Sequence, residues 1–171
     1  MLKTATTLCA LALLLVTAGA AVAQDRPLPP FKAADYPIAV RKTLSNAVLE
    51  CRQADGGKVT FAPDTVRKVD FNGDGRDDYV VSLEDTKCST FESIFCGTGG
   101  CGVDFLVTMP DGSVRSLFEA TIHKYEILPG TPRKVRFWVH HGWCGGGGPG
   151  EACTKDIRIT YKKFTPMPKT W

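Results

Sequence analysis

The sequence predicts an α+β fold in which one N-terminal helix packs on a mainly antiparallel β sheet, cross-linked by three disulfides. Three observations support this class. One stretch near the N-terminus has helical periodicity, and a series of short apolar runs separated by Gly, Pro and Asp follows it. Six cysteines lie after residue 23. A sheet built from so many short strands is also compatible with curling toward a barrel.

Residues 1–23 have the organisation of a signal peptide. Lys3 gives a positive start, residues 11–16 form the centre of an apolar run, and Ala21 to Ala23 form an A-x-A cleavage pattern. A membrane anchor is the alternative, but the run is short for a span and a polar, proline-rich segment follows it. We therefore expect an exported protein, either periplasmic or secreted.

The remaining chain is expected to form a proline-rich extended lead-in over residues 24–34 and a single domain over residues 35–171. The formal net charge of +3 falls by one when Lys3 leaves with the leader. So small an excess does not favour nucleic acid or an anionic membrane as a partner. No later segment is long and apolar enough to be expected to span a bilayer.

Cysteine usage agrees with export, because an even number of cysteines in an exported chain predicts disulfides. Cys9 leaves with the leader. Zinc binding is the alternative, but the spacings form no CxxC knuckle. We expect Cys144 to pair with Cys153, because a glycine-rich loop between two strands brings its own ends together. The other expected pairs are Cys96 with Cys101 and Cys51 with Cys88.

The predicted helix begins after Asp35, an N-cap residue type, with Pro37 near its first turn, and ends at Gly56 and Gly57. Its apolar stripe is expected to face the core. The members of that stripe are Ile38, Ala39, Leu44, Ala47, Val48 and Cys51.

Eight strands are expected after the helix. Three of them alternate cleanly, so Val103, Phe105 and Val107 should share one face. The same applies to alternate residues from Val135 to Val139 and from Ile157 to Tyr161. Asp111-Gly112 is a hairpin signal. The predicted strands cover residues 59–61, 66–69, 79–83, 103–109, 114–118, 123–128, 135–140 and 157–161.

Residues 70–78 have the spacing of a calcium-binding loop. Oxygen-bearing side chains recur at every second position, Gly75 permits a sharp bend, and a further carboxylate follows, which suits an ion that takes six to eight oxygens. Val81 stands where an EF-hand requires Glu, and the flanks predict strands, so this is not an EF-hand. A solvated acidic turn is the alternative. The expected ligands of a structural Ca²⁺ are Asp70, Asn72, Asp74, the backbone carbonyl of Arg76, and Asp78.

This stretch resembles the strand–loop–strand calcium loop of the FG-GAP/VCBS repeat family, whose motif runs roughly D-x-N-x-D-G-x-x-D before an apolar strand. The resemblance covers about a dozen residues and implies that Asp70, Asn72, Asp74 and Asp78 are ligands. Family members usually carry several repeats, whereas this chain has one, so a propeller is not implied. More loosely, the chain resembles small cysteine-rich exported proteins of bacteria with no assigned function.

Two other features deserve a functional interpretation. Phe95 and Trp143 lie beside two glycine loops that the predicted disulfides would clamp, so they are candidate anchors for a partner. Disulfides that compensate for loose connections are the simpler explanation of those loops. His140 and His141 invite a catalytic interpretation, but consecutive strand residues point to opposite faces, and no HExxH motif is present.

The sequence thus predicts an exported calcium-binding domain with a binding or envelope-associated role and no catalytic residues. The partner would be an unidentified protein or envelope component. The alternatives are a small secreted hydrolase that uses His140 or His141, and a purely structural envelope protein.

Overall fold

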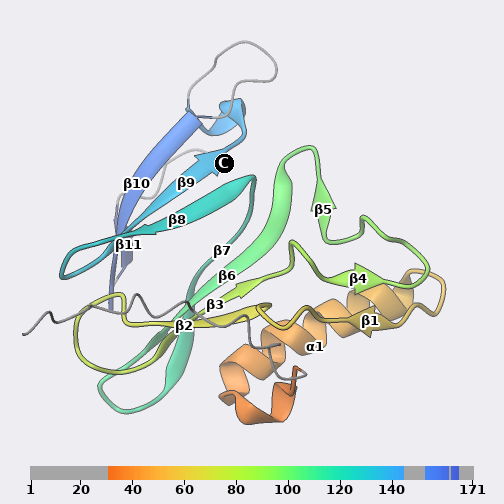
Figure 1. The fold of residues 1–171 in the computed structure, drawn as a ribbon, viewed down its shortest axis with the longest axis horizontal. Helices are drawn as coiled ribbons and strands as arrows, with labels where there is room; N and C mark the ends of the chain where they lie inside the picture. Colours follow the sequence, from red (N-terminus) through yellow and green to blue (C-terminus); the bar gives the residue numbers. More distant parts are fainter. Residues whose placement is uncertain (1–30, 145–152, 162, 166–171) are drawn as a thin grey trace, which may run out of the picture.

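The computed structural model describes residues 31–144, 153–161 and 163–165 (Figure 1). Residues 1–30, which include the expected signal peptide, and the glycine run that begins at residue 145 lie outside the described residues. Three helices are present: the 3₁₀ helices η1 (Ala33–Asp35) and η2 (His141–Cys144), and the α-helix α1 (Ile38–Gln53). The strands are β1 (Val59–Thr60), β2 (Val66–Val69), β3 (Asp78–Ser82), β4 (Lys87–Cys88), β5 (Cys96–Gly97), β6 (Gly100–Thr108), β7 (Val114–Ile122), β8 (Lys124–Leu128), β9 (Lys134–Val139), β10 (Cys153–Thr160) and β11 (Lys163–Thr165).

The strands form three antiparallel sheets. The largest has five strands in the order β2-β3-β6-β5, with β7 also paired to β6. The second has the order β11-β10-β9-β8, and β1 pairs with β4 in a two-stranded ribbon. The prediction of one helix with mainly antiparallel sheet is confirmed. The described strands form no closed barrel, so curling of that kind stays a prediction.

The helix α1 starts later than predicted. Its N-cap is Pro37, whereas Asp35 ends η1 and makes no side-chain capping hydrogen bond to α1. Ile38 was expected on the buried stripe but has 76 % of its surface exposed, because it precedes the first inward position, Val40. The buried residues of the helix are Val40, Leu44, Ala47 and Cys51.

The main core lies between the five-stranded and four-stranded sheets. Val103, Phe105 and Val107 of β6 enter this core, as do alternate residues of β9 from Val135 to Val139. Ile157 and Ile159 of β10 are buried there, and Tyr161 packs against the cluster. The three predicted alternations are therefore confirmed, and they fix which face of each strand points inward.

The opposite face of the five-stranded sheet packs against α1. Leu106 of β6 and Tyr79 and Val81 of β3 contact Val40 and Leu44 of the helix in a second core cluster. In Figure 1, α1 accordingly lies below this sheet while β8 to β10 lie above it. Strand β6 is thus the central strand of the molecule, because it is covered on both faces.

Residues at the end of the expected lead-in belong to the domain. Phe31 stacks against Tyr36 at a ring separation of 5.7 Å and packs on Phe61 at 5.2 Å. Ala33 begins η1 and packs against the second core cluster. The packed domain therefore includes residues 31–34, which the sequence assigned to an extended lead-in.

All three predicted disulfides are present. Cys51–Cys88 joins α1 to β4 with a Cα separation of 5.6 Å. Cys96–Cys101 links β5 to β6 at 4.0 Å, and Cys144–Cys153 links η2 to β10 at 6.4 Å. The predicted hairpin at Asp111-Gly112 is also confirmed, since it connects the paired strands β6 and β7.

Candidate metal-binding site

The loop over residues 70–77 connects β2 to β3, two strands that pair directly from Val69 with Asp78 to Val66 with Val81. The chain turns twice through left-handed conformations, at Gly73 with φ 81° and at Gly75 with φ 80°. Glycine adopts this conformation without the steric penalty that other residues meet. The predicted bend at Gly75 is therefore present.

Asp70 organises the first half of the loop. Its Oδ1 accepts hydrogen bonds from the backbone N–H groups of Gly73 at 2.8 Å and Asp74 at 3.2 Å. Its Oδ2 accepts a third from Gly75 at 2.9 Å. Three N–H donors converging on one carboxylate wrap the backbone around that side chain. A carboxylate held in this way has little freedom to move away from the loop.

Asn72 and Asp74 continue the pattern. The Asn72 Oδ1 accepts the Asp74 N–H at 2.9 Å, whereas the Asn72 Nδ2 is buried and has no hydrogen-bond partner among the described residues. Asp74 Oδ1 accepts the Arg76 N–H at 2.7 Å, and its Oδ2 contacts the Arg76 guanidinium at 3.2 Å. The Tyr161 hydroxyl also donates to Asp74 Oδ2, which holds the pKa of Asp74 below its ordinary value.

Asp78 is the buried end of the site, with 0 % of its surface exposed. Its Oδ2 accepts the Phe71 N–H at 2.9 Å and its Oδ1 accepts the Thr108 N–H at 2.8 Å. Burial raises its pKa to about 6, the two N–H bonds oppose that rise, and the nearby charges of Asp74 and Asp70 add to it. The Asp78 carboxylate therefore anchors the loop to β6 in a region of crowded negative charge.

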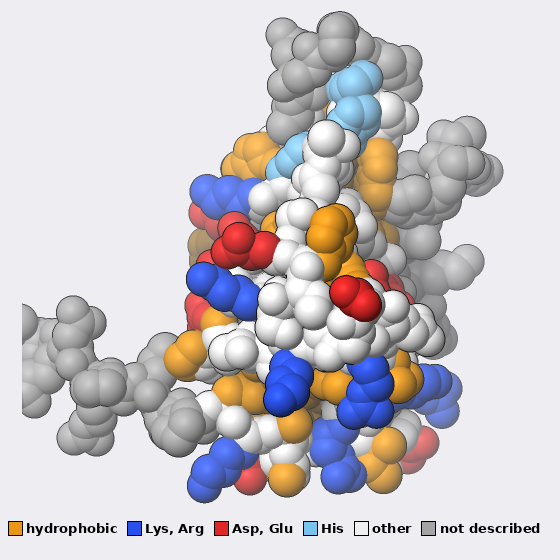
Figure 2. Space-filling view, turned by 90° about the vertical axis from the view of Figure 1, so that its right-hand side faces the viewer, with side chains coloured by type: hydrophobic (Ala, Val, Ile, Leu, Met, Phe, Trp, Pro, Cys, Tyr) orange, Lys and Arg blue, Asp and Glu red, His pale blue; other side chains and the backbone are white. Residues whose placement is uncertain are grey.

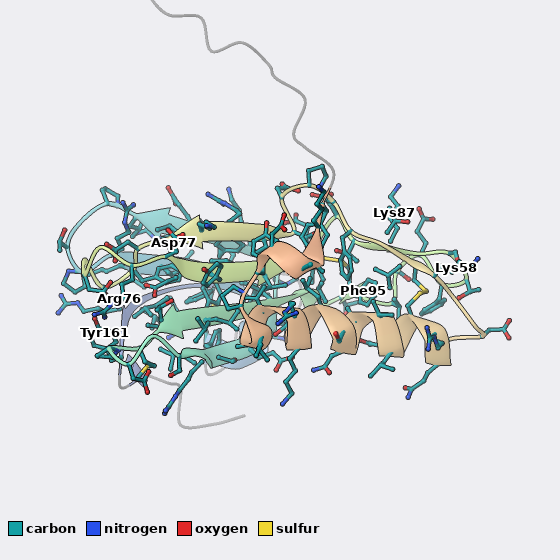
Figure 3. All side chains as sticks on the ribbon, turned by 90° about the horizontal axis from the view of Figure 1, so that it is seen from below. Lys58, Arg76, Asp77, Lys87, Phe95 and Tyr161 are labelled. Carbon is teal, nitrogen blue, oxygen red and sulfur yellow. A yellow bond between two sulfur atoms is a disulfide. The ribbon has the colours of Figure 1, made fainter. Side chains whose placement is uncertain are left out.

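Two charged residues frame the outer side of the loop. Arg76, whose backbone carbonyl is an expected ligand, pairs its side chain with Asp74. Asp77 is outside the expected ligand set and pairs with Lys68 at 2.8 Å. Figure 3 shows Arg76, Asp77 and Tyr161 at the same end of the molecule. The Lys68–Asp77 pair is largely exposed and contributes little to stability, whereas the Asp74 side chain of the other pair is mostly covered.

The donor chemistry suits calcium, while the described geometry shows a loop held by its own backbone. An oxygen that accepts one N–H bond, such as Asp70 Oδ2, keeps a lone pair for an ion, whereas Asp70 Oδ1 already accepts two N–H bonds. Within the described ranges, no group of three or more His, Cys, Asp or Glu side chains is arranged to hold a metal ion. An ion at this loop would have to draw Asp74 away from the Arg76 guanidinium.

The two candidate anchors for a partner differ in accessibility. Phe95 has 6 % of its surface exposed and packs with Ala47, Cys51 and Cys88 in a third core cluster. Its ring is therefore not available to a partner in this structure. Trp143 lies in η2, is partly exposed, and packs against the main core. The glycine run beside it lies outside the described residues.

The expectation that His140 and His141 point to opposite faces is wrong. Strand β9 ends at Val139, and η2 begins at His141, so the period-two rule no longer applies there. The two rings lie 3.9 Å apart between centroids. His140 Nδ1 accepts the Gly142 N–H at 3.3 Å. Neither ring forms an ion pair with a carboxylate in the described part of the chain, and the hydrolase alternative stays a prediction.

Histidine side chains gather toward the top of the face seen in Figure 2, whereas lysines and arginines gather toward its lower part. Lys58 and Lys87, labelled in Figure 3, lie at the β1–β4 end of the molecule.

Two contacts were not anticipated from the sequence. Tyr161 was expected only as a core-facing strand residue, yet its hydroxyl reaches Asp74. Asp104, with 3 % of its surface exposed, accepts hydrogen bonds from Thr43 of α1 at 2.7 Å and Ser116 of β7 at 2.5 Å. A carboxylate inside an apolar strand is a signal for such a buried polar contact.

Comparison with protein families, with curated proteins and with solved structures finds no match for the chain. No helix among the described residues is long and apolar enough to cross a membrane.

Proposed function

We propose that this chain is an exported domain that binds one structural Ca²⁺ in the loop over residues 70–78. The ion would be held by Asp70, Asn72, Asp74, the Arg76 carbonyl and Asp78, as in the FG-GAP/VCBS loop that this stretch resembles. When bound, calcium supplies positive charge and a rigid oxygen-coordinated centre to the β2–β3 connection. The role of the domain is to bind a protein or envelope component, not to catalyse a reaction.

The observation that carries this proposal is the crowding of negative charge around a buried carboxylate. Asp70 and Asp74 lie near enough to Asp78 for their charges to raise its pKa, and all three belong to the expected ligand set. A divalent cation relieves this repulsion, whereas the Arg76 guanidinium reaches only Asp74.

Export is supported by the disulfides. Three disulfides in a chain of this size are typical of oxidising compartments and rare in the cytosol. Extracellular calcium is abundant enough for weak sites, with dissociation constants of about 10⁻⁴ to 10⁻³ M, to be filled. We therefore place the protein in the periplasm or outside the cell.

Calorimetric titration of the oxidised protein with Ca²⁺ and Mg²⁺ tests the proposal. We expect a single Ca²⁺ site with a dissociation constant of about 10⁻⁴ to 10⁻³ M and weaker binding of Mg²⁺, which demands a stricter octahedron. The Asp70→Ala/Asp74→Ala variant should abolish binding. Asp77→Asn is the matched control, because this carboxylate is in the same loop but pairs with Lys68. Absence of Ca²⁺ binding, or equal loss in the control, would refute the proposal.

A further inference from the structure

A pocket of about 280 Å³ lies where the edges of the two large sheets face each other. Strand β2 forms the edge of the five-stranded sheet and β8 the edge of the four-stranded sheet. Residues from the segment before β2, the turn after β3 and the start of β8 line it. None of these residues belongs to the loop over residues 70–78, so the pocket is a separate feature of the fold.

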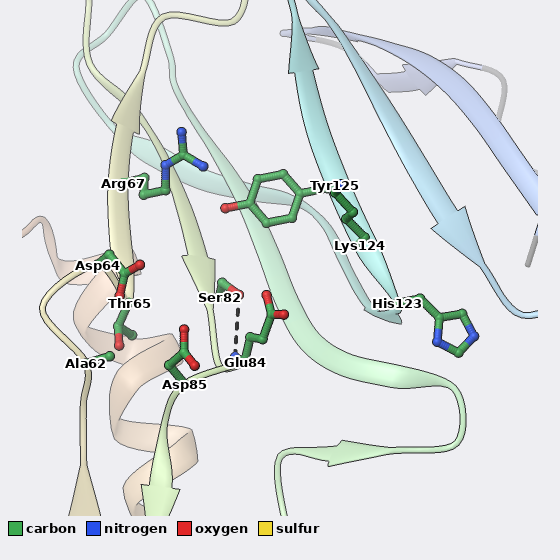
Figure 4. Close-up of a pocket in the computed structure, with 10 residues that line it drawn as sticks. All are labelled: Ala62, Asp64, Thr65, Arg67, Ser82, Glu84, Asp85, His123, Lys124 and Tyr125. Carbon is green, nitrogen blue, oxygen red and sulfur yellow. Dashed lines mark hydrogen bonds between the residues drawn. The ribbon is translucent and has the colours of Figure 1, made fainter.

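Groups of opposite charge lie at opposite ends of this pocket (Figure 4). Asp64, Glu84 and Asp85 lie at the end of the pocket where β3 leaves the sheet, whereas the Arg67 guanidinium and the Tyr125 hydroxyl point toward each other at the other end. Across residues 31–144, 153–161 and 163–165, none of these four charged residues forms an ion pair. The pocket therefore presents unneutralised groups of opposite sign to whatever enters it.

The Arg67 end is held in place by the core. The Tyr125 ring meets Phe105, a fully buried residue of β6, edge-on at 5.4 Å. The Arg67 guanidinium lies 5.9 Å from the centroid of the Tyr125 ring. Burial raises the pKa of Tyr125, the neighbouring Arg67 guanidinium opposes that rise, and the charges of Glu84 and Asp64 add to it. The hydroxyl is therefore a fixed, protonated donor at neutral pH, beside the guanidinium.

The two other basic residues that line the pocket, Lys124 and His123, do not add positive charge beside Arg67. The Lys124 ammonium lies 5.0 Å from the Trp138 ring centroid, on the neighbouring strand β9. The His123 ring points away from the carboxylates and from Arg67 in Figure 4. Three carboxylates against Arg67 and Lys124 leave the pocket lining with an excess of one negative charge.

We propose that this pocket binds a small cationic amino acid, such as free lysine, ornithine or arginine. The ligand carboxylate would contact Arg67 and the Tyr125 hydroxyl, and its two positive groups would contact Asp64, Glu84 and Asp85. Arginine recognises carboxylates through a planar fork of N–H donors, and a tyrosine hydroxyl adds a further donor. A ligand with two positive groups and one carboxylate matches this distribution of charge better than a neutral zwitterion, which has only one positive group.

The size of the pocket supports a ligand of this class. Pockets for drug-sized ligands usually hold about 300 to 1,000 Å³, so about 280 Å³ suits a single amino acid. The site is open to solvent, because Arg67 and the three carboxylates Asp64, Glu84 and Asp85 are all exposed. We expect modest affinity, with a dissociation constant of about 1 mM or tighter, because solvent weakens the outer contacts.

The test uses the oxidised protein with L-lysine, its decarboxylated analogue cadaverine, and glycine as probes, followed by amide chemical shifts in NMR spectra. We expect L-lysine to shift the amides of β2, the 82–85 turn and the start of β8. Cadaverine should bind at least tenfold more weakly, since it cannot contact Arg67. Glycine should bind more weakly as well, since it has one positive group.

Variants assign the two ends of the ligand. Arg67→Gln should remove the preference for L-lysine over cadaverine and should not weaken cadaverine binding, since the lost guanidinium repels that dication. Glu84→Gln with Asp85→Asn should weaken both ligands at least tenfold. Arg41→Gln and Glu50→Gln, exposed changes on α1, are the matched controls and should have no effect. Equal affinity for lysine and cadaverine, or no shifts with lysine, would overturn the proposal whatever the outcome for calcium.

Discussion

The Tyr161 hydroxyl donates a hydrogen bond to Oδ2 of Asp74, a residue that precedes it by 87 positions in the chain. Tyr161 directly follows β10 of the four-stranded sheet, whereas Asp74 lies in the loop that leaves the five-stranded sheet. This contact therefore connects the proposed calcium loop to the opposite side of the main core. It also fixes the orientation of one expected ligand.

Removing the Tyr161 hydroxyl is expected to weaken calcium binding. Groups that hydrogen-bond to a metal-ligating carboxylate orient it, and their loss typically lowers metal affinity about tenfold or more. Tyr161→Phe should therefore raise the calcium dissociation constant about tenfold in a calorimetric titration. Tyr125→Phe, which removes a hydroxyl from the separate pocket, is the control. Equal affinities in all three proteins would show that Tyr161 does not position Asp74.

The buried carboxylate of Asp104 should make stability depend on pH. Burial raises its pKa, while the Ser116 and Thr43 hydroxyls oppose the rise. The native state therefore keeps a proton that the unfolded chain releases above its ordinary pKa of about 4. The free energy of unfolding should fall as the pH rises through this range and level off above the folded pKa.

Asp104→Asn tests this dependence, because an amide keeps the size and hydrogen-bonding capacity of the carboxyl without its charge. We expect the slope of stability against pH to become shallower and the variant to be at least as stable as the parent at pH 7, by urea unfolding. Some slope should remain, since Asp78 also has a raised pKa. An unchanged slope would mean that the pKa of Asp104 is the same in the native and the unfolded chain, and would contradict the raised value.

The disulfides should differ in their contribution to stability. The Cys51–Cys88 bond closes 37 residues of chain, whereas Cys96–Cys101 closes 5. The chain-entropy estimate gives losses of about 4 kcal/mol and about 2 kcal/mol on removal of each. Urea unfolding of the paired Cys→Ala variants should show this order. The reverse order would indicate that loop length does not govern the contribution of these bonds.

Gly100 is expected to be intolerant of a side chain. It has φ 106°, and a Cβ there would overlap the Ile122 carbonyl and the His123 amide at the β7–β8 connection. Gly100→Ala should lower the free energy of unfolding by at least about 2 kcal/mol. Gly97→Ala, in the same hairpin but with no neighbour within 4 Å of its Cβ, should be nearly neutral. Thermal unfolding that ranks the two variants equally would contradict this.

The fold was predictable wherever the local pattern decided it. Strand β2 matches its predicted bounds, and the three alternating strands place the expected residues in the main core. The strands β4, β5 and β11, of two or three residues each, were missed because such short segments carry little periodicity. The prediction that Asp35 caps the helix is wrong, because Pro37 takes the N-cap position. Asp35 is instead the last residue of η1.

The site was predictable only within one loop. The alternation from Asp70 to Asp78 indicated which carboxylates lie in the β2–β3 connection, because those residues are neighbours in sequence. The contacts of Tyr161 with Asp74 and of Thr43 with Asp104 cross 87 and 61 positions. The approach of the edge strands β2 and β8, which forms the pocket lined by Arg67 and Tyr125, is likewise set by packing that a local pattern does not encode.

The central claim is that the loop over residues 70–78 binds a structural Ca²⁺, and thermal unfolding of the oxidised protein tests it most directly. The melting temperature should rise in millimolar Ca²⁺ relative to EDTA, because an ion that binds only the native state stabilises it. Mg²⁺ should have a smaller effect, and Asp70→Ala/Asp74→Ala should abolish the rise. An equal melting temperature in Ca²⁺ and EDTA at every concentration would contradict the claim and leave the segment as an acidic turn.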